Sequence, residues 1–243
     1  MVKNKQHDIE AGVGGGALYP NMMENPQIRW AFVRKVYTIV VIQILLTIAV
    51  ACVVIFVPAI SRFLLAHTPA SLAVFILIII APFFVMLPMI YFRQRHPINL
   101  ILLMLFTVCI SLTVGLACAT RSGKVILEAA SLTVVVVIGL TLYTFWAAKR
   151  GHDFNFLGPF LFAALLVLMI YCFIQIFIPF GKVGTTIYGC LAALIFSGFI
   201  IYDTDNLIKR HSYDDYVCAA ISLYLDIVNL FMALLTAFGA SDS

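Results

Sequence analysis

Residues 197–231, SGFIIYDTDNLIKRHSYDDYVCAAISLYLDIVNLF, decide how this chain folds. The stretch places two acidic residues, Asp203 and Asp226, inside segments that are otherwise apolar. A carboxylate near the centre of a bilayer costs about 2.5–3.5 kcal/mol even on insertion scales, so acidic residues there are rare and mark functional sites. Two of them on neighbouring helices therefore predict one shared site.

The composition is that of an integral membrane protein. The 243 residues are 63% hydrophobic and only 11% charged, and the mean hydropathy is +1.09, whereas a soluble domain has about 25% charged residues. A helix needs roughly 20 apolar residues to cross the hydrocarbon layer. Seven segments meet this need: 36–57, 71–92, 98–119, 125–147, 157–178, 184–202 and 216–238, and the sixth can extend to about 209. We therefore predict an all-α bundle of seven transmembrane helices.

The basic residues predict how the bundle is oriented. We expect a disordered cytosolic tail at 1–34, a membrane domain at 35–238 and a short C-terminal tail at 239–243. The tail and the loops on its side carry eleven Lys and Arg residues, against four on the other side. Because Lys and Arg are enriched in cytoplasmic loops, we expect a cytosolic N-terminus. The basic residues are scattered over the loops, which gives no support for a nucleic-acid partner. The expected partner is the lipid bilayer. The expected location is an endomembrane (ER, Golgi or vacuole) or the plasma membrane.

The two acidic residues are predicted to meet. No Pro or Gly follows Tyr202 before Arg210, so the sixth helix can continue to about Lys209. At 1.5 Å per residue, Asp203 then lies roughly 10 Å from the end of its helix, and Asp226 lies roughly 16 Å from the start of the next. Two carboxylates in contact share a proton, and when ionised they offer hard oxygens to Ca²⁺. The pair is a candidate pH-sensing and Ca²⁺ site, or else a structural pair that only fixes the helix register.

The last helix carries a stripe of small and polar residues. Steps of four and three residues place these side chains on one face: Asp215, Ala219, Ser222, Asp226, Asn229, Ala233 and Thr236. Such a narrow polar stripe predicts a central helix, with the stripe against its partners or a water-filled path. Ser222 and Asn229 are therefore supporting candidates for the site.

Other charged residues are candidates for supporting roles. Arg93, near the end of the second span, could turn inward and offset the charge of the acid pair, or it could instead reach lipid headgroups. Glu128, expected in the first turn of the fourth helix, either caps that helix or lines an ion vestibule on the far side. Asp205, two residues after Asp203, is a further supporting candidate for the site. We expect no cofactor, with Ca²⁺ only as a transported or bound ion.

Two long motifs resemble a known family. Residues 198–210, GFIIYDTDNLIKR, and 214–231, DDYVCAAISLYLDIVNLF, resemble the signature of the Bax-inhibitor/LIFEGUARD membrane proteins. Residues 140–162, LTLYTFWAAKRGHDFNFLGPFLF, resemble its plant LIFEGUARD branch. The resemblance implies a seven-helix bundle with helix 7 central and a Ca²⁺ leak that responds to H⁺. It also implies suppression of programmed cell death and stress responses, with membrane-protein partners.

The resemblance further implies which residues form the site. The family's two-aspartate site maps onto Asp203 and Asp226, and its basic partner maps onto Arg93 or Arg95. We therefore expect a Ca²⁺ leak channel or exchanger that is not an enzyme. The alternative is a regulator that transports nothing and binds other membrane proteins. An intramembrane aspartyl protease also uses two carboxylates, but the second site here reads LYLD and lacks both the GxGD and the Pro-Ala-Leu motif of that class.

Overall fold

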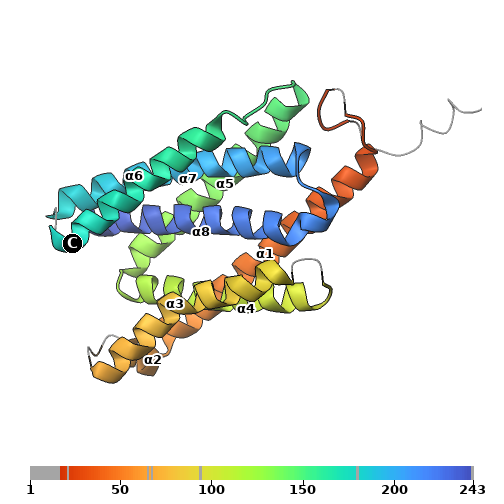
Figure 1. Ribbon diagram of the computed structural model, residues 1–243. Helices are drawn as coiled ribbons and strands as arrows, with labels where there is room; N and C mark the ends of the chain where they lie inside the picture. Colours follow the sequence, from red (N-terminus) through yellow and green to blue (C-terminus); the bar gives the residue numbers. More distant parts are fainter. Residues whose placement is uncertain are drawn as a thin grey trace, which may run out of the picture.

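The computed structural model describes residues 17–20, 22–64, 66, 68–92, 95–178 and 181–241. Within these ranges the chain forms only helices (Figure 1). They are α1 (Pro26–Phe56), α2 (Pro58–Leu64), α3 (Pro69–Tyr91), α4 (Ile98–Ala119), α5 (Gly123–Lys149), α6 (Leu157–Phe177), α7 (Gly181–Lys209), the short 3-10 helix η1 (Tyr213–Asp215) and α8 (Tyr216–Ser241). Seven helices of the described chain are long and apolar enough to cross a membrane, which confirms the predicted all-α, multi-pass class.

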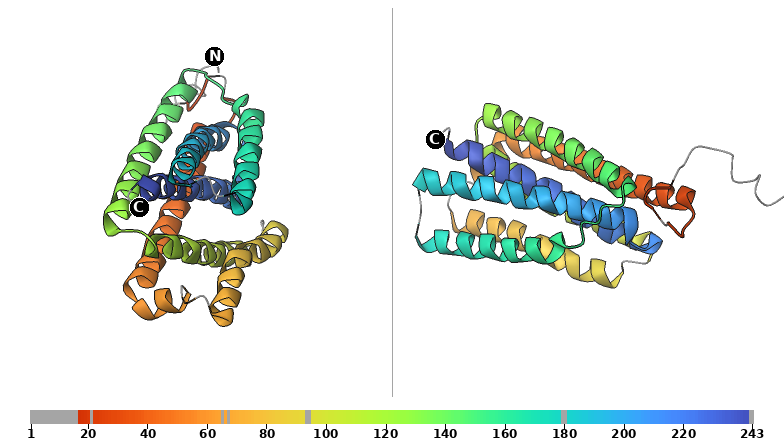
Figure 2. Two further views of the ribbon diagram at one scale, coloured as in Figure 1. Left: turned by 90° about the vertical axis from the view of Figure 1, so that its left-hand side faces the viewer. Right: turned by 90° about the horizontal axis from the view of Figure 1, so that it is seen from above.

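Helix α8 lies at the centre of the bundle. It contacts α1, α4, α5 and α7, and it is the most buried of the seven spans. Seen end-on, α7 and α8 are flanked by α5 on one side and α6 on the other, with α3 and α4 below them (Figure 2, left). Burial extends around α8, because Leu223 and Leu230, which lie off the polar stripe, are as enclosed as the stripe itself. The last span is central, as predicted, but its buried residues are not confined to the polar stripe.

The first helix begins earlier than predicted. The Asn25 side chain accepts a hydrogen bond from the Gln27 backbone N–H at 2.9 Å, and Pro26 occupies the first turn. Both features start a helix, because they satisfy or remove backbone donors that have no partner in the first turn. Residues 26–34, expected in the disordered tail, are therefore helical. Residues 1–16 lie outside the described part of the chain.

Helices α2 and α7 also differ or agree in extent with the predicted spans. Helix α2 occupies part of the segment 58–70, where only a loop was expected. Pro82 and Pro88 lie inside α3. Helix α7 runs to Lys209, as the absence of Pro and Gly indicated. Asp203 therefore lies within a continuous helix rather than in a loop.

Glycine allows α7 to approach α8 closely. A Cβ atom at Gly189 would lie 2.7 Å from the backbone nitrogen of Ala237 and 2.8 Å from the carbonyl oxygen of Ala233. Both are backbone atoms of α8, which cannot move without moving the helix. Small residues at helix contacts allow this approach in membranes, where van der Waals packing drives helix association.

Substitution of Gly189 by leucine should separate the two helices. We expect Gly189→Leu to lower the free energy of unfolding by about 2 kcal/mol or more, because overpacking a close contact forces backbone shifts. Gly139→Leu is the matched control, since a Cβ there meets nothing within 4 Å. Thermal unfolding in one detergent compares the two variants. Equal melting temperatures would contradict the close α7–α8 contact.

Candidate functional site

The structure brings Asp203 of α7 and Asp226 of α8 together. Their carboxyl groups lie close enough to act on each other. Asp226 is 7% exposed and Asp203 is half-buried. A hydrogen bond between two carboxyl groups requires a proton on one of them, since an ionised carboxylate only accepts. The arrangement, hereafter the acid pair, can thus hold one proton between two helices.

Asp203 has two further polar neighbours. Asn206 lies one turn along α7 from Asp203, and its Oδ1 accepts a hydrogen bond from Arg210 Nη1 at 2.8 Å. His211, in the turn between α7 and η1, lies close enough for its charge to act on Asp203. Burial lowers the pKa of His211 below 6.5, with Arg29 acting in the same direction and Asp203 and Asp215 in the opposite one. The imidazole is therefore mostly neutral near pH 7.

Asp205 forms a second polar centre at the end of α7. Its side chain is fully buried. One carboxylate oxygen lies 2.5 Å from Lys209 Nζ, and the other lies 3.1 Å from Arg210 Nη1. The backbone N–H of Phe154, in the loop between α5 and α6, donates to the second oxygen at 3.3 Å. Asp205 therefore connects its own helix to a loop 51 residues earlier in the chain.

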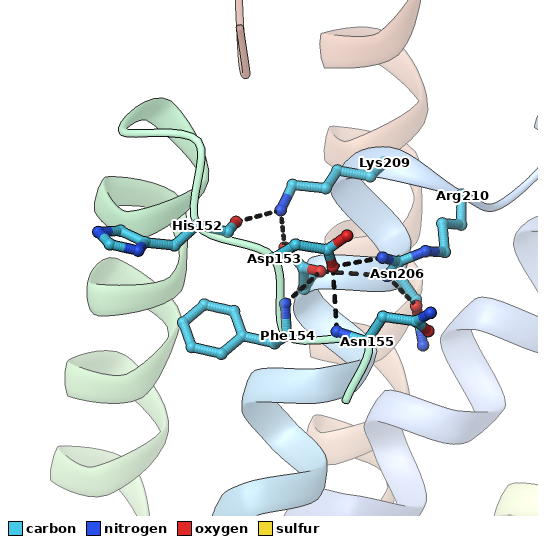
Figure 3. Close-up of polar contacts among 8 residues, drawn as sticks. His152, Asp153, Phe154, Asn155, Asn206, Lys209 and Arg210 are labelled. Carbon is cyan, nitrogen blue, oxygen red and sulfur yellow. Dashed lines mark hydrogen bonds and ion pairs between the residues drawn. The ribbon is translucent and has the colours of Figure 1, made fainter. Parts of the chain in front are cut away.

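The loop between α5 and α6 supplies the other partners (Figure 3). Asp153 forms an ion pair with Arg210, and Lys209 donates to the backbone carbonyl of His152. The hydrogen bond from Arg210 lowers the pKa of Asp153. Two acids and two bases thus balance each other in what we call the Asp205 cluster: His152, Asp153, Phe154, Asp205, Asn206, Lys209 and Arg210.

The expected basic partner does not approach the acid pair from Arg95. This residue is exposed, and its guanidinium lies 5.8 Å from the centre of the Phe92 ring. Arg93 lies outside the described residues. Of the stripe residues, Ser222 and Asn229 are half-buried on α8.

Glu128 is remote from the acid pair. Helix α5 begins at Gly123, so Glu128 lies in its second turn and the expected first-turn cap is wrong. Ser122 caps the helix instead and accepts from the Val125 backbone N–H at 3.4 Å. Glu128 is exposed and lies 3.8 Å from Lys124, at the opposite end of the bundle from the end of α7.

A buried polar network ties α8 to α1 and α4. Tyr224 shares a 2.8 Å hydrogen bond with Thr47, which also accepts from Ser111 at 3.1 Å. The Gln43 amide nitrogen donates to Thr107 Oγ1 at 2.9 Å. All five side chains are buried. The network joins the helix that carries Asp226 to α1 and α4.

The chain before α1 also packs against the bundle. We call residues 17–20 and 22–25 the N-terminal segment. Leu18 is buried in a small apolar cluster with Ala148 of α5 and Ile208 of α7. The carboxylate of Glu24 lies 2.7 Å from Arg29 Nη2 and accepts from Tyr213 at 2.7 Å.

Arg29 links this segment to the turn that follows α7. It is 2% exposed, donates to the His211 carbonyl oxygen at 2.6 Å, and lies 5.0 Å from the centre of the Tyr213 ring. The hydrogen bond from Tyr213, followed by the charge of Arg29, lowers the pKa of Glu24 below 4.5. Its contribution is therefore complete above pH 4.5 and is lost only as pH falls through the lower folded-state value. This contact does not titrate between pH 5 and 8.

A charge at Leu18 should release the N-terminal segment. We expect Leu18→Asp to lower hydrogen-exchange protection of residues 18–20 and 22–25 by about tenfold or more, because an unpaired charge is not tolerated in an apolar cluster. Met23→Asp is the control, since Met23 is fully exposed. Equal exchange in the two variants, measured by mass spectrometry, would show that Leu18 does not hold the segment.

The acid pair offers few ligands to a metal ion. Ca²⁺ takes six to eight oxygen ligands. Among the residues that the structure describes, no group of three or more His, Cys, Asp or Glu side chains could hold a metal ion. Two carboxyl groups alone leave most of the coordination shell to water.

Comparison with known proteins places the chain. The family model described as "Inhibitor of apoptosis-promoting Bax1" matches residues 29–243. Protein LIFEGUARD 4 of Arabidopsis thaliana is 60% identical over 240 residues, which cover 98% of this chain and 97% of that protein. Protein lifeguard 4 of Mus musculus is 39% identical, over 86% and 84% of the two chains. The Golgi anti-apoptotic protein of Vaccinia virus (strain Lister) is 37% identical, over 88% and 87%.

The match spans all seven membrane helices and includes both residues of the acid pair. Identity to the plant protein is well above that to the animal and viral proteins. The chain therefore belongs to the Bax-inhibitor family, in its plant LIFEGUARD branch.

Proposed function

We propose that this protein is a pH-sensitive Ca²⁺ leak channel or exchanger that takes part in suppressing programmed cell death and in stress responses. The observation that carries the proposal is the acid pair. Asp203 of α7 and Asp226 of α8 lie close together inside two membrane spans, and α8 is the centre of the bundle.

The chemistry of the pair supports a link between protons and cations. With one shared proton, the pair carries one negative charge, and the hydrogen bond between the carboxyl groups holds α7 against α8. Loss of that proton leaves two adjacent negative charges, which repel each other and attract a divalent cation. A proton on the acid pair therefore opposes both the separation of α7 from α8 and the binding of Ca²⁺ to the two carboxylates.

The biological setting is part of the proposal. The name of the viral relative, Golgi anti-apoptotic protein, supports an endomembrane location and a role against cell death. We place the N-terminus in the cytosol, because the loops at that end carry most of the Lys and Arg residues. A reporter fused after Ser243 should then be lumenal or extracellular. A cytosolic reporter would overturn this orientation.

A second candidate function is a regulator that moves no ions. The family description, inhibitor of apoptosis-promoting Bax1, names an action on another protein and favours this alternative. Under it, the acid pair only fixes the register of α7 and α8.

Calcium flux into liposomes distinguishes the two functions. Purified protein is reconstituted with a Ca²⁺ indicator inside the liposomes, and flux is measured from pH 5 to pH 8 for the wild type and Asp226→Asn. The leak function predicts pH-dependent flux in the wild type that Asp226→Asn loses. Flux no greater than in empty liposomes, with folded wild-type protein verified by thermal unfolding, would contradict the leak and favour the regulator.

A further inference from the structure

The buried polar network between α1, α4 and α8 lies in the middle of the bundle. Its five side chains, hereafter the Gln43 network, are Gln43, Thr47, Thr107, Ser111 and Tyr224. Gln43 lies near the midpoint of α1, and Thr107 lies near the midpoint of α4. The buried residues that flank the network on α1 are all apolar: Val36, Val40, Ala51 and Val54. The network is therefore a polar site enclosed in an apolar interior.

The hydroxyl protons of the Gln43 network are already in use. Thr47, Thr107 and Ser111 each donate to the backbone carbonyl oxygen four residues earlier, at 2.8, 2.8 and 2.5 Å. A hydroxyl group has a single proton. Because the proton of Thr47 is engaged in this way, Tyr224 is the donor in the 2.8 Å hydrogen bond between these two side chains. All four hydroxyl groups of the network have thus given their protons to other acceptors than the Gln43 amide.

The amide oxygen of Gln43 is a buried acceptor that the network does not satisfy. Thr107 Oγ1 has used its proton and can only accept, so the amide nitrogen faces it, at 2.9 Å. The amide oxygen, Oε1, is buried and has no hydrogen-bond partner among the residues that the structure describes. Turning the amide round would place Oε1 against a hydroxyl oxygen that has no proton to give. A buried polar atom is normally hydrogen-bonded, so the site calls for a donor from outside the network.

The chemistry of the site favours water over a metal ion. Its five side chains are neutral, and a charge in the middle of a bilayer is costly without a counter-charge. Tyr224 and Asp226 lie about 200° apart around α8, at 3.6 residues per turn, and Asp226 lies near Asp203 of α7. The acid pair therefore does not supply that charge. A water molecule donates two O–H groups and makes about three hydrogen bonds when buried, which suits a site with more acceptors than donors.

We propose that the Gln43 network is a binding site for a buried water molecule, which donates a hydrogen bond to Gln43 Oε1. The hydroxyl oxygens of Ser111 and Tyr224, which act as donors in the network, can accept the second proton of this water. Water then completes the polar contact of α8 with α1 and α4 in the middle of the bundle, where direct hydrogen bonds leave one acceptor over. The site is separate from the acid pair and does not rest on the proposed function.

X-ray radical footprinting detects a buried water where it is bound. An X-ray pulse splits water into hydroxyl radicals, these modify the side chains next to them, and mass spectrometry measures the modification of each residue. Tyr224 is 0% exposed, so radicals from bulk water do not reach it. We expect Tyr224 to be modified in the wild-type protein in lipid. Gln43→Leu should lower its rate of modification by about fivefold or more, because a buried water is held by its hydrogen bonds.

Gln175→Leu is the matched control. The Gln175 amide nitrogen also donates to a threonine hydroxyl, that of Thr185 at 3.1 Å, but Gln175 is half-buried and joins α6 to α7. The same chemical change at this place should leave the modification of Tyr224 as it is in the wild type. Thermal unfolding verifies that both variants are folded.

Three results would overturn the proposal. The first is a wild-type Tyr224 that is not modified, a result that requires no variant to fold. The second is equal modification of Tyr224 in the wild type and in folded Gln43→Leu, since the water would then be held without Gln43. The third is a wild-type melting temperature that falls when Na⁺ is replaced by N-methylglucamine while that of Gln43→Leu does not, because a cation would then be bound at Oε1 in place of water.

Discussion

Asp226→Asn is expected to remove the pH response of Ca²⁺ flux, so that the ratio of flux at pH 5 to flux at pH 8 falls to about one, because a shared proton needs both carboxyl groups. An amide at position 226 cannot lose a proton in this range. Asp203 would then have a neutral partner at every pH, and the repulsion between two carboxylates would never arise. Flux in indicator-loaded liposomes measures the ratio.

The same mechanism predicts that the two acidic residues are not independent. Asp203→Asn alone should flatten the pH response as Asp226→Asn does, and the double variant should differ little from either. Groups in direct contact are coupled, and a double-mutant cycle measures that coupling. Asp214→Asn is the matched control, since Asp214 is exposed in η1. Additive effects of Asp203→Asn and Asp226→Asn would contradict a shared proton.

Asp205→Asn is expected to lower the free energy of unfolding by about 3 kcal/mol, because the buried Lys209 ammonium loses its counter-charge and keeps only the neutral carbonyl of His152 among its described contacts. Asp205 is 0% exposed and Lys209 is 12% exposed, so water cannot replace the lost carboxylate at Lys209. Arg210 is 33% exposed and keeps Asp153, which limits the loss. Thermal or denaturant unfolding in detergent measures the change.

Asp153→Asn provides the comparison within the same cluster. Its carboxylate is 58% exposed, and exposed ion pairs contribute about 1 kcal/mol or less. The contribution of Asp153 to stability also depends on pH, because the ion pair with Arg210 requires the ionised carboxylate. The pKa of Asp153 is lowered below 3.8, so its contribution is complete above pH 3.8 and lost as pH falls through the lower folded-state value. Equal destabilisation by Asp205→Asn and Asp153→Asn would show that burial of Asp205 is not what makes it important.

Local sequence patterns were sufficient for the spans and for the acid pair. Apolar runs of about 20 residues can only be helices in a bilayer, and all seven appear in the structure. The approach of Asp203 and Asp226 follows from helical rise and a short turn, both of which are local quantities.

Local sequence patterns could not predict the contacts between segments that are distant in the chain. The spacing of Asp205 and Lys209 is a helical pair that the sequence displays, but nothing local indicates that Asp153 and Phe154 join them. The burial of Arg29 against the turn after α7 depends on where Glu24 and Tyr213 meet, 189 residues apart. The helix starts at Pro26 and Pro58 lie outside the apolar runs, so hydropathy does not indicate them, although a proline suits the first turn of a helix.

The most direct test of the central claim is to count the protons that the acid pair holds. Infrared difference spectra between pH 8 and pH 5 are recorded for the wild type, Asp203→Asn and Asp226→Asn in lipid. A shared proton predicts one protonated-carboxyl band in the wild type that is lost or displaced in both variants. A band that persists unchanged in either variant would mean that the two carboxyl groups titrate independently, and it would contradict the account.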